Sequence, residues 1–180
     1  MGWRDVTPSD AVEAGDWIES RLQSFGSGTA GSVVPTGFPA YARSESRAGL
    51  AAVLARHTST PHRCWFCLWD GYGYLHGAPA VMYFWASDDP HPQPPPPPPP
   101  PPLLRKSRVR LPNRDYLLFT GSAAEAEGWD DGPNLWWPDD RAWCAAAEID
   151  LDYTLIGGSS ELRDELVRAG ARPIKVDDPL

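Results

Sequence analysis

The chain has 180 residues, the size of one ordinary domain, and 42% of them are hydrophobic, so it can bury a core without disulfides or metals. Its formal net charge is −8, whereas general nucleic-acid binding requires a basic surface. No segment approaches the roughly 20 apolar residues of a membrane-spanning helix, so we expect neither a nucleic-acid partner nor a membrane partner.

The start of the chain predicts a cytoplasmic protein. Residues 1–16 contain acidic side chains instead of a basic region followed by an apolar one, which argues against an export signal. The three cysteines are an odd number and fit reduced thiols better than a disulfide framework.

The first half of the chain predicts two helices and two strands. Thr7, Pro8 and Asp10 are typical of a helix start, and the apolar residues that follow recur at intervals of three and four, so we expect a helix over 8–24. A second helix is expected over 44–56. The β-formers of 63–69 and 80–85 predict a hairpin with a long, glycine-containing loop.

A run of nine prolines, Pro94–Pro102, interrupts the chain. Proline fixes φ and lacks an amide donor, so the run predicts an extended polyproline II rod. We expect 90–106 to form a proline-rich loop or linker. A spacer is the preferred interpretation, and a ligand for an aromatic groove is the alternative.

The second half predicts mostly strands and one long helix. Strands are expected over 107–111 and 115–120, and a short helix capped by Ser122 and Glu125 should follow. Tryptophan-rich turns are expected over 129–140, a strand over 142–153, a helix capped by Ser159 or Ser160 through about Ala169, and an edge strand over 173–176.

These elements together predict a single α+β domain over residues 1–180. We expect an antiparallel or mixed sheet flanked by two or three helices, with the polyproline loop inserted between two strands.

The carboxylates Glu148, Asp150 and Asp152 are spaced by two, so on a strand they would project from one face. Such a comb is suited to a divalent cation through hard oxygen ligands, and the alternative is a solvated face of an acidic protein. Cys64 and Cys67 suggest zinc, but the second ligand pair that a structural site needs is not evident in the spacing. We expect no cofactor, because no nucleophile elbow or phosphate-binding loop is present.

The nine tryptophans are hard to hide in one small core, so some should remain partly exposed. Acidic charge combined with exposed aromatic rings suits binding to a basic protein surface. We therefore expect a non-catalytic, immunity-like or regulatory interaction module. Its expected binding residues are Trp136, Trp137, Asp139, Asp140, Glu148, Asp150 and Asp152. The alternative is a metal-dependent enzyme that uses Glu148, Asp150 and Asp152.

Four blocks carry a resemblance: 34–43 (VPTGFPAYAR), 64–73 (CWFCLWDGYG), 111–121 (LPNRDYLLFTG) and 133–159 (PNLWWPDDRAWCAAAEIDLDYTLIGGS). Together they resemble a family of actinobacterial proteins for which no activity is established. The resemblance implies a soluble bacterial protein whose two halves form one domain. This chain departs from the family at Ala147, where a threonine is expected, and in a shorter tract after Arg43.

Overall fold

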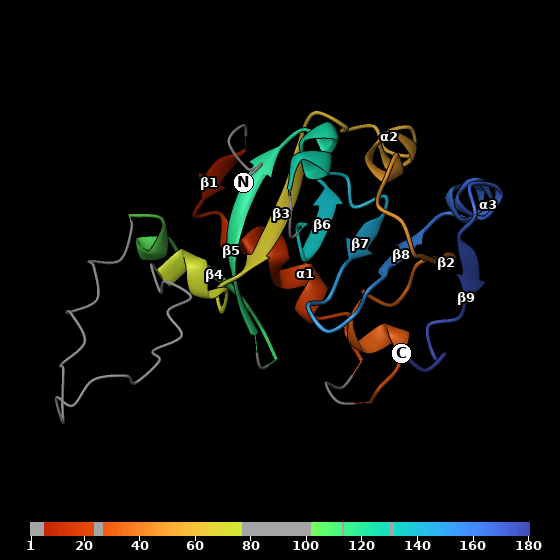
Figure 1. Ribbon diagram of the computed structural model, residues 1–180, viewed down its shortest axis with the longest axis horizontal. Helices are drawn as coiled ribbons and strands as arrows, with labels where there is room; N and C mark the ends of the chain where they lie inside the picture. Colours follow the sequence, from red (N-terminus) through yellow and green to blue (C-terminus); the bar gives the residue numbers. More distant parts are fainter. Residues whose placement is uncertain (1–5, 24–26, 77–101, 113, 130–131) are drawn as a thin grey trace, which may run out of the picture.

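A nine-stranded sheet organises the chain in the computed structural model, which describes residues 6–23, 27–76, 102–112, 114–129 and 132–180. The strands run in the order β1-β5-β3-β6-β7-β8-β2-β9, and β4 pairs with β5 (Figure 1). Every pairing among them is antiparallel. The strands are β1 (Thr7–Ser9), β2 (Ala40–Ser44), β3 (Cys64–Trp69), β4 (Arg108–Leu111), β5 (Arg114–Gly121), β6 (Leu135–Pro138), β7 (Cys144–Ala146), β8 (Thr154–Gly158) and β9 (Arg172–Ile174).

Short helices connect the strands of the described chain. The α-helices are α1 (Asp16–Glu19), α2 (Leu50–Ala55) and α3 (Ser160–Arg168). The 3₁₀ turns are η1 (Val12–Gly15), η2 (Ala30–Ser32), η3 (Gly73–His76), η4 (Pro102–Arg105) and η5 (Ala123–Gly128). An antiparallel α+β architecture is thus present. The polyproline loop was expected over 90–106, and residues 90–101 of it lie outside the described residues.

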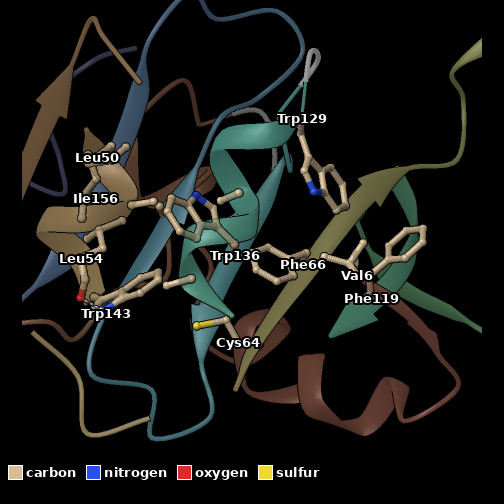
Figure 2. Packing of buried hydrophobic residues seen from close by; sticks show 14 of the residues in the cluster. Val6, Leu50, Leu54, Cys64, Phe66, Phe119, Trp129, Trp136, Trp143 and Ile156 are labelled. Atoms are coloured by element: carbon tan, nitrogen blue, oxygen red, sulfur yellow. Dashed lines mark hydrogen bonds between the residues drawn. The ribbon is translucent and has the colours of Figure 1, made fainter. Parts of the chain in front are cut away.

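The sheet is covered on both faces, so it carries two hydrophobic cores. Alternate residues of each strand point to opposite faces. On β3, Phe66 joins the core that packs under α2, α3 and η5, whereas Cys67 joins the core under α1 and η2. Figure 2 shows the first of these cores, where the rings of Phe66 and Trp136 stack with centroids 6.1 Å apart.

The two-sided cover buries most of the described tryptophans, and one of them stays partly exposed, as expected. Of the seven tryptophans that the structure describes, only Trp69 is half-buried. The buried ones are Trp17, Trp65, Trp129, Trp136, Trp137 and Trp143. Two cores provide the room that one core of a small domain would lack, so the rings serve packing.

Several predicted elements of the second half are confirmed. The expected strands 107–111 and 115–120 form the β4–β5 hairpin, in which Leu111 pairs with Arg114. Helix α3 begins after Ser159, whose hydroxyl accepts the Leu162 amide at 3.2 Å. The expected short helix after Ser122 is a 3₁₀ turn closed by a reciprocal capping box with Glu125. The predicted edge strand is β9, at the end of the sheet.

The helix expected over 8–24 is wrong for most of its length. Pro8 pairs with Phe119 of β5 inside the edge strand β1, where its missing amide costs no ladder bond. A Cβ added at Gly15 would lie 2.7 Å from Cγ1 of Val109, so this glycine permits close packing of η1 on β4. Tertiary pairing therefore overrides the helical pattern.

The expectations for 129–153 are also wrong: a segment predicted as turns contains a strand, and a segment predicted as one strand contains a turn. The segment predicted as turns contains β6, which lies in the middle of the sheet between β3 and β7. The segment predicted as one strand is the β7–β8 hairpin, whose loop spans residues 147–153. Within that loop the Leu151 amide donates to the Glu148 carbonyl at 3.0 Å, which is a turn contact.

Two further expectations concern α2 and β3. The helix expected over 44–56 is limited to Leu50–Ala55, because Ala40–Ser44 forms β2 between β8 and β9. Strand β3 is present, but its two edges pair with β5 and β6. Its expected hairpin partner, 80–85, lies outside the described residues. No helix in the described part of the chain is long and apolar enough to cross a membrane.

Candidate functional site: a cleft between α2 and η5

The expected carboxylate comb is replaced by an ion-pair cluster in the β7–β8 loop. Arg114 of β5 lies between Glu148 and Asp150, bonding to Glu148 and donating to Asp150 at 3.0 Å. Asp152 is exposed. The loop is not extended, and Glu148 and Asp150 share one guanidinium instead of facing an open site.

The expected binding residues around β6 are used within the fold. Trp136 and Trp137 are core residues on opposite faces of the sheet. Asp139 accepts the Trp65 indole N–H at 3.0 Å. Asp140 accepts the Ser59 hydroxyl at 2.7 Å; burial would raise its pKa, but the hydrogen bonds from residues 58, 59 and 142 outweigh burial and lower it.

The three cysteines are buried thiols. Cys64 and Cys67 point to opposite faces of β3, so they do not face one ion together. Burial raises the pKa of the Cys64 thiol to about 12 and raises those of Cys67 and Cys144 as well. Within the described residues, no group of three or more His, Cys, Asp or Glu side chains is placed to hold a metal ion.

A cleft of about 480 Å³ lies between the start of α2, η5 and the loop before β6. We call it the α2–η5 cleft. Its size falls within the usual range of ligand pockets. Six of the residues that line it are Arg47, Leu50, Glu127, Trp129, Trp136 and Thr154. Two indole rings and aliphatic side chains therefore form its walls.

Trp129 gives the cleft its most unusual feature. Its side chain is only 5% exposed, and its indole nitrogen Nε1 is buried without a hydrogen-bond partner among the described residues. In Figure 2 the nitrogen lies on the edge of the ring that faces Phe66 and Trp136. A buried donor without an acceptor costs about 1–3 kcal/mol of stability.

No protein-family model, curated protein or solved structure matches this chain. The resemblance to the actinobacterial family thus stays a prediction, and the site is interpreted from its geometry.

Trp17 is another described tryptophan whose indole N–H has no partner, but it does not line the cleft. Trp17 Nε1 is also buried without a partner. Its ring packs edge-on against Trp137, with centroids 6.2 Å apart, and Trp17 is not among the residues that line the α2–η5 cleft. Trp129 is therefore the indole that combines an unused donor with a cavity wall.

Two opposite charges stand at the rim of the cleft. Arg47 and Glu127 are both exposed, and neither forms an ion pair with the described residues. The guanidinium of Arg47 lies against Gly132, where an added Cβ would collide with it, and the positive φ of Gly132 (+83°) also favours glycine. The rim thus offers one cation and one anion to a ligand.

Asn134 fixes the loop that carries one wall. Its side chain accepts the Trp69 amide at 2.8 Å and donates to the Tyr72 hydroxyl at 3.1 Å and to the Ala147 carbonyl at 3.3 Å. Because Ala147 and the neighbouring Pro133 both line the cleft, this buried amide holds two of its edges together.

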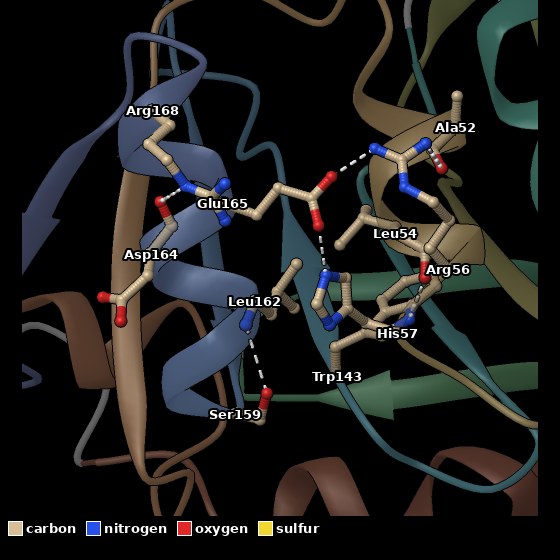
Figure 3. Close-up of polar contacts among 10 residues, drawn as sticks. All are labelled: Ala52, Leu54, Arg56, His57, Trp143, Ser159, Leu162, Asp164, Glu165 and Arg168. Atoms are coloured by element: carbon tan, nitrogen blue, oxygen red, sulfur yellow. Dashed lines mark hydrogen bonds and ion pairs between the residues drawn. The ribbon is translucent and has the colours of Figure 1, made fainter.

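The contact between α2 and α3 holds the other wall. Glu165 of α3 accepts hydrogen bonds from Arg56 and from His57, the latter at 2.7 Å (Figure 3). Beneath them the Trp143 indole donates to the Leu54 carbonyl at 2.9 Å. These bonds fix the end of α2, whose start lines the cleft.

Sequence reasoning did not find this site. Arg47, Trp129 and Thr154 come from three distant segments and belong to no motif. The high tryptophan content of the chain was the one feature that pointed toward it. That content predicted recognition by tryptophan side chains, but the prediction named Trp136 and Trp137.

Proposed function

We propose that this chain is a non-catalytic binding module that captures a partner protein in the α2–η5 cleft. The observation that carries the proposal is the 480 Å³ cleft itself, whose walls include the aromatic side chains of Trp129 and Trp136. A partner that inserts an apolar group into the cleft covers these aromatic walls.

The acidic charge of the chain extends this proposal to a basic partner. A net charge of −8 attracts a basic protein during encounter, and Glu127 at the rim supplies a local anion. Such an attraction weakens as salt screens it. An immunity-like or regulatory role in the cytoplasm is part of the same proposal, since both need only stoichiometric capture.

The metal-dependent enzyme has less support than binding. Its three carboxylates lie in a loop, and Arg114 neutralises part of their charge. A cation would have to displace this guanidinium from Glu148 and Asp150.

The test is affinity capture from the native host with the intact chain and two matched variants. Ala48 and Ala52 are both exposed residues beside or on α2, but only Ala48 lines the cleft. Ala48→Trp should fill the cleft and abolish capture of the partner, whereas Ala52→Trp should capture it as well as the intact chain does. The captured partner should elute with salt.

A partner retained equally by both variants would contradict the proposal, because it would bind outside the cleft. Thermal unfolding of the two variants controls for folding, since each adds a ring at an exposed position.

A further inference from the structure

We infer that a second cavity, beside the last strand of the sheet, binds a small monocarboxylate with an apolar body. This cavity, which we call the β2–β9 cavity, measures about 320 Å³, at the small end of the range of ligand pockets. No residue lines both this cavity and the α2–η5 cleft, so the inference is independent of the proposed function. The residues that line it include Arg43, Tyr153, Leu155, Arg172, Ile174 and Asp178.

Two arginines lie directly opposite each other at this cavity. Arg43 of β2 pairs with Arg172 of β9 in the antiparallel register. Like charges in such a cross-strand pair destabilise a sheet. Glu45 offsets part of this repulsion, since its Oε1 atom accepts from Nε of Arg43 and from Nη2 of Arg172, each at 2.9 Å. One carboxylate therefore serves two guanidinium groups.

Most N–H donors of these two guanidinium groups remain available. A guanidinium has several N–H donors, and among the described residues Glu45 is the hydrogen-bond partner of both side chains. Glu45 does not belong to the lining of the cavity, whereas Arg43 and Arg172 do. A ligand carboxylate can thus approach from the cavity and accept N–H bonds from both arginines while Glu45 stays in place.

Tyr153 fixes one of the two guanidinium groups. The Cζ atom of Arg43 lies 3.4 Å from the centroid of the Tyr153 ring, and this tyrosine is buried in the core under α1 and η2. The side chain of Arg43 is 25% exposed, against 62% for Arg172. Because Arg43 is stacked and hydrogen-bonded before any ligand arrives, little side-chain entropy is lost when it binds one.

The rest of the lining selects the body and the charge of the ligand. Leu155, Pro173 and Ile174 offer apolar surface to a hydrocarbon body. Asp178 also lines the cavity, with Oδ2 accepting the Lys175 amide at 2.8 Å, and its charge opposes a second negative charge on the ligand. A monocarboxylate therefore fits better than a phosphate monoester, which carries roughly two negative charges at pH 7.

The net charge of −8 has little influence on so small a ligand. At physiological ionic strength, salt screens exposed charges that lie more than about 8 Å away. The two guanidinium groups at the cavity therefore decide whether a small monoanion binds.

The test is calorimetric titration of the full chain with N-acetyl-leucine, which has one carboxylate and an apolar side chain. N-acetyl-leucinamide is the matched probe without the charge and should bind about tenfold more weakly or not at all, as expected for hydrogen bonds to a charged group. Arg43→Gln and Arg172→Gln should each weaken binding of N-acetyl-leucine by a similar factor. Arg168→Gln, an exposed position on α3 outside the cavity, should bind it as the intact chain does.

Thermal unfolding of each variant separates lost binding from lost folding. Arg172 is the more exposed of the two arginines, so Arg172→Gln keeps the test decisive if Arg43→Gln does not fold. An intact chain that does not bind N-acetyl-leucine, or a folded Arg172→Gln that binds it equally well, would overturn the inference. Equal binding of the amide, or tighter binding of inorganic phosphate, would overturn the choice of a monocarboxylate.

Ala48→Trp separates this inference from the proposed function. It fills the α2–η5 cleft and leaves the β2–β9 cavity unchanged, so it should bind N-acetyl-leucine as the intact chain does. Loss of binding in a folded Ala48→Trp would place the ligand in the α2–η5 cleft and overturn the inference.

Discussion

At the scale of single residues, the indole nitrogens of this chain divide into used and unused donors. Trp143 donates to the Leu54 carbonyl and Trp65 donates to Asp139, whereas Trp129 and Trp17 donate to no described residue. Folding alone explains the first pair, since buried polar groups are normally satisfied. The donors of Trp129 and Trp17 are buried without this satisfaction.

This division predicts unequal costs for two substitutions that remove equal ring volume. Trp143→Phe should lower the free energy of unfolding by about 0.5–1.5 kcal/mol more than Trp129→Phe, the net value of one neutral hydrogen bond. The Leu54 carbonyl also accepts the His57 amide at 3.0 Å, so it keeps one donor. Urea denaturation of both variants measures the difference, and equal losses would show that the Trp129 donor is satisfied.

The cysteines give a second prediction at this scale. All three are buried, and burial raises their pKa values, that of Cys64 to about 12. Because only the thiolate reacts, a disulfide reagent at pH 8 should label no cysteine of the folded chain and three of the unfolded chain. Rapid labelling of Cys64 in the folded chain would contradict the buried position of β3.

At the scale of elements, the contact between α2 and α3 should depend on pH. Hydrogen bonds from Arg56 and His57 lower the pKa of Glu165 to about 2, from an ordinary value of 4.5. The unfolded chain thus binds the proton more readily than the folded chain does. The stabilisation is complete above pH 4.5 and is lost as pH falls toward 2.

Glu165→Gln tests this contact against Asp164→Asn on the same helix. Asp164 is exposed, and among the described residues its carboxylate pairs with its neighbour Arg163 alone, at 2.7 Å, so its loss should change little. Urea unfolding at pH 7 and pH 3 should show that Glu165→Gln is less stable than the intact chain at pH 7 and closer to it at pH 3. A deficit that is the same at both pH values would exclude the ion pairs as its cause.

Elements were predictable from sequence where local chemistry decides them. The β4–β5 hairpin, the capping box of Ser122 and the N-cap of α3 depend on neighbours within a few residues, and all three are present. The carboxylates from Glu148 to Asp152 alternate like a strand, yet they form a turn because β7 and β8 pair around them. The spacing of these residues along the chain does not indicate that pairing.

The candidate site was even less accessible to sequence reasoning. The α2–η5 cleft is assembled from residues near positions 47, 127 and 154, and only the sheet brings them together. Tryptophan-based recognition was expected at Trp136 and Trp137, but the cover on both faces of the sheet buries them. A burial pattern of this kind arises from tertiary packing and has no local signature.

At the scale of the whole molecule, the chain combines an acidic net charge with the α2–η5 cleft. In the function that we propose, the net charge of −8 favours encounter with a basic partner, and the cleft selects which partner stays bound. The sheet supplies rigidity, because it packs on both faces and holds the two indole walls in place.

The most direct test of the cleft as the binding site is the indole region of a ¹H–¹⁵N spectrum, recorded with and without the partner that the chain captures. The signal that disappears in Trp129→Phe identifies the Trp129 N–H. We predict that this signal moves on binding, while the Trp143 signal, already bonded to Leu54, stays in place. A Trp129 signal that does not change in the saturated complex would contradict the account.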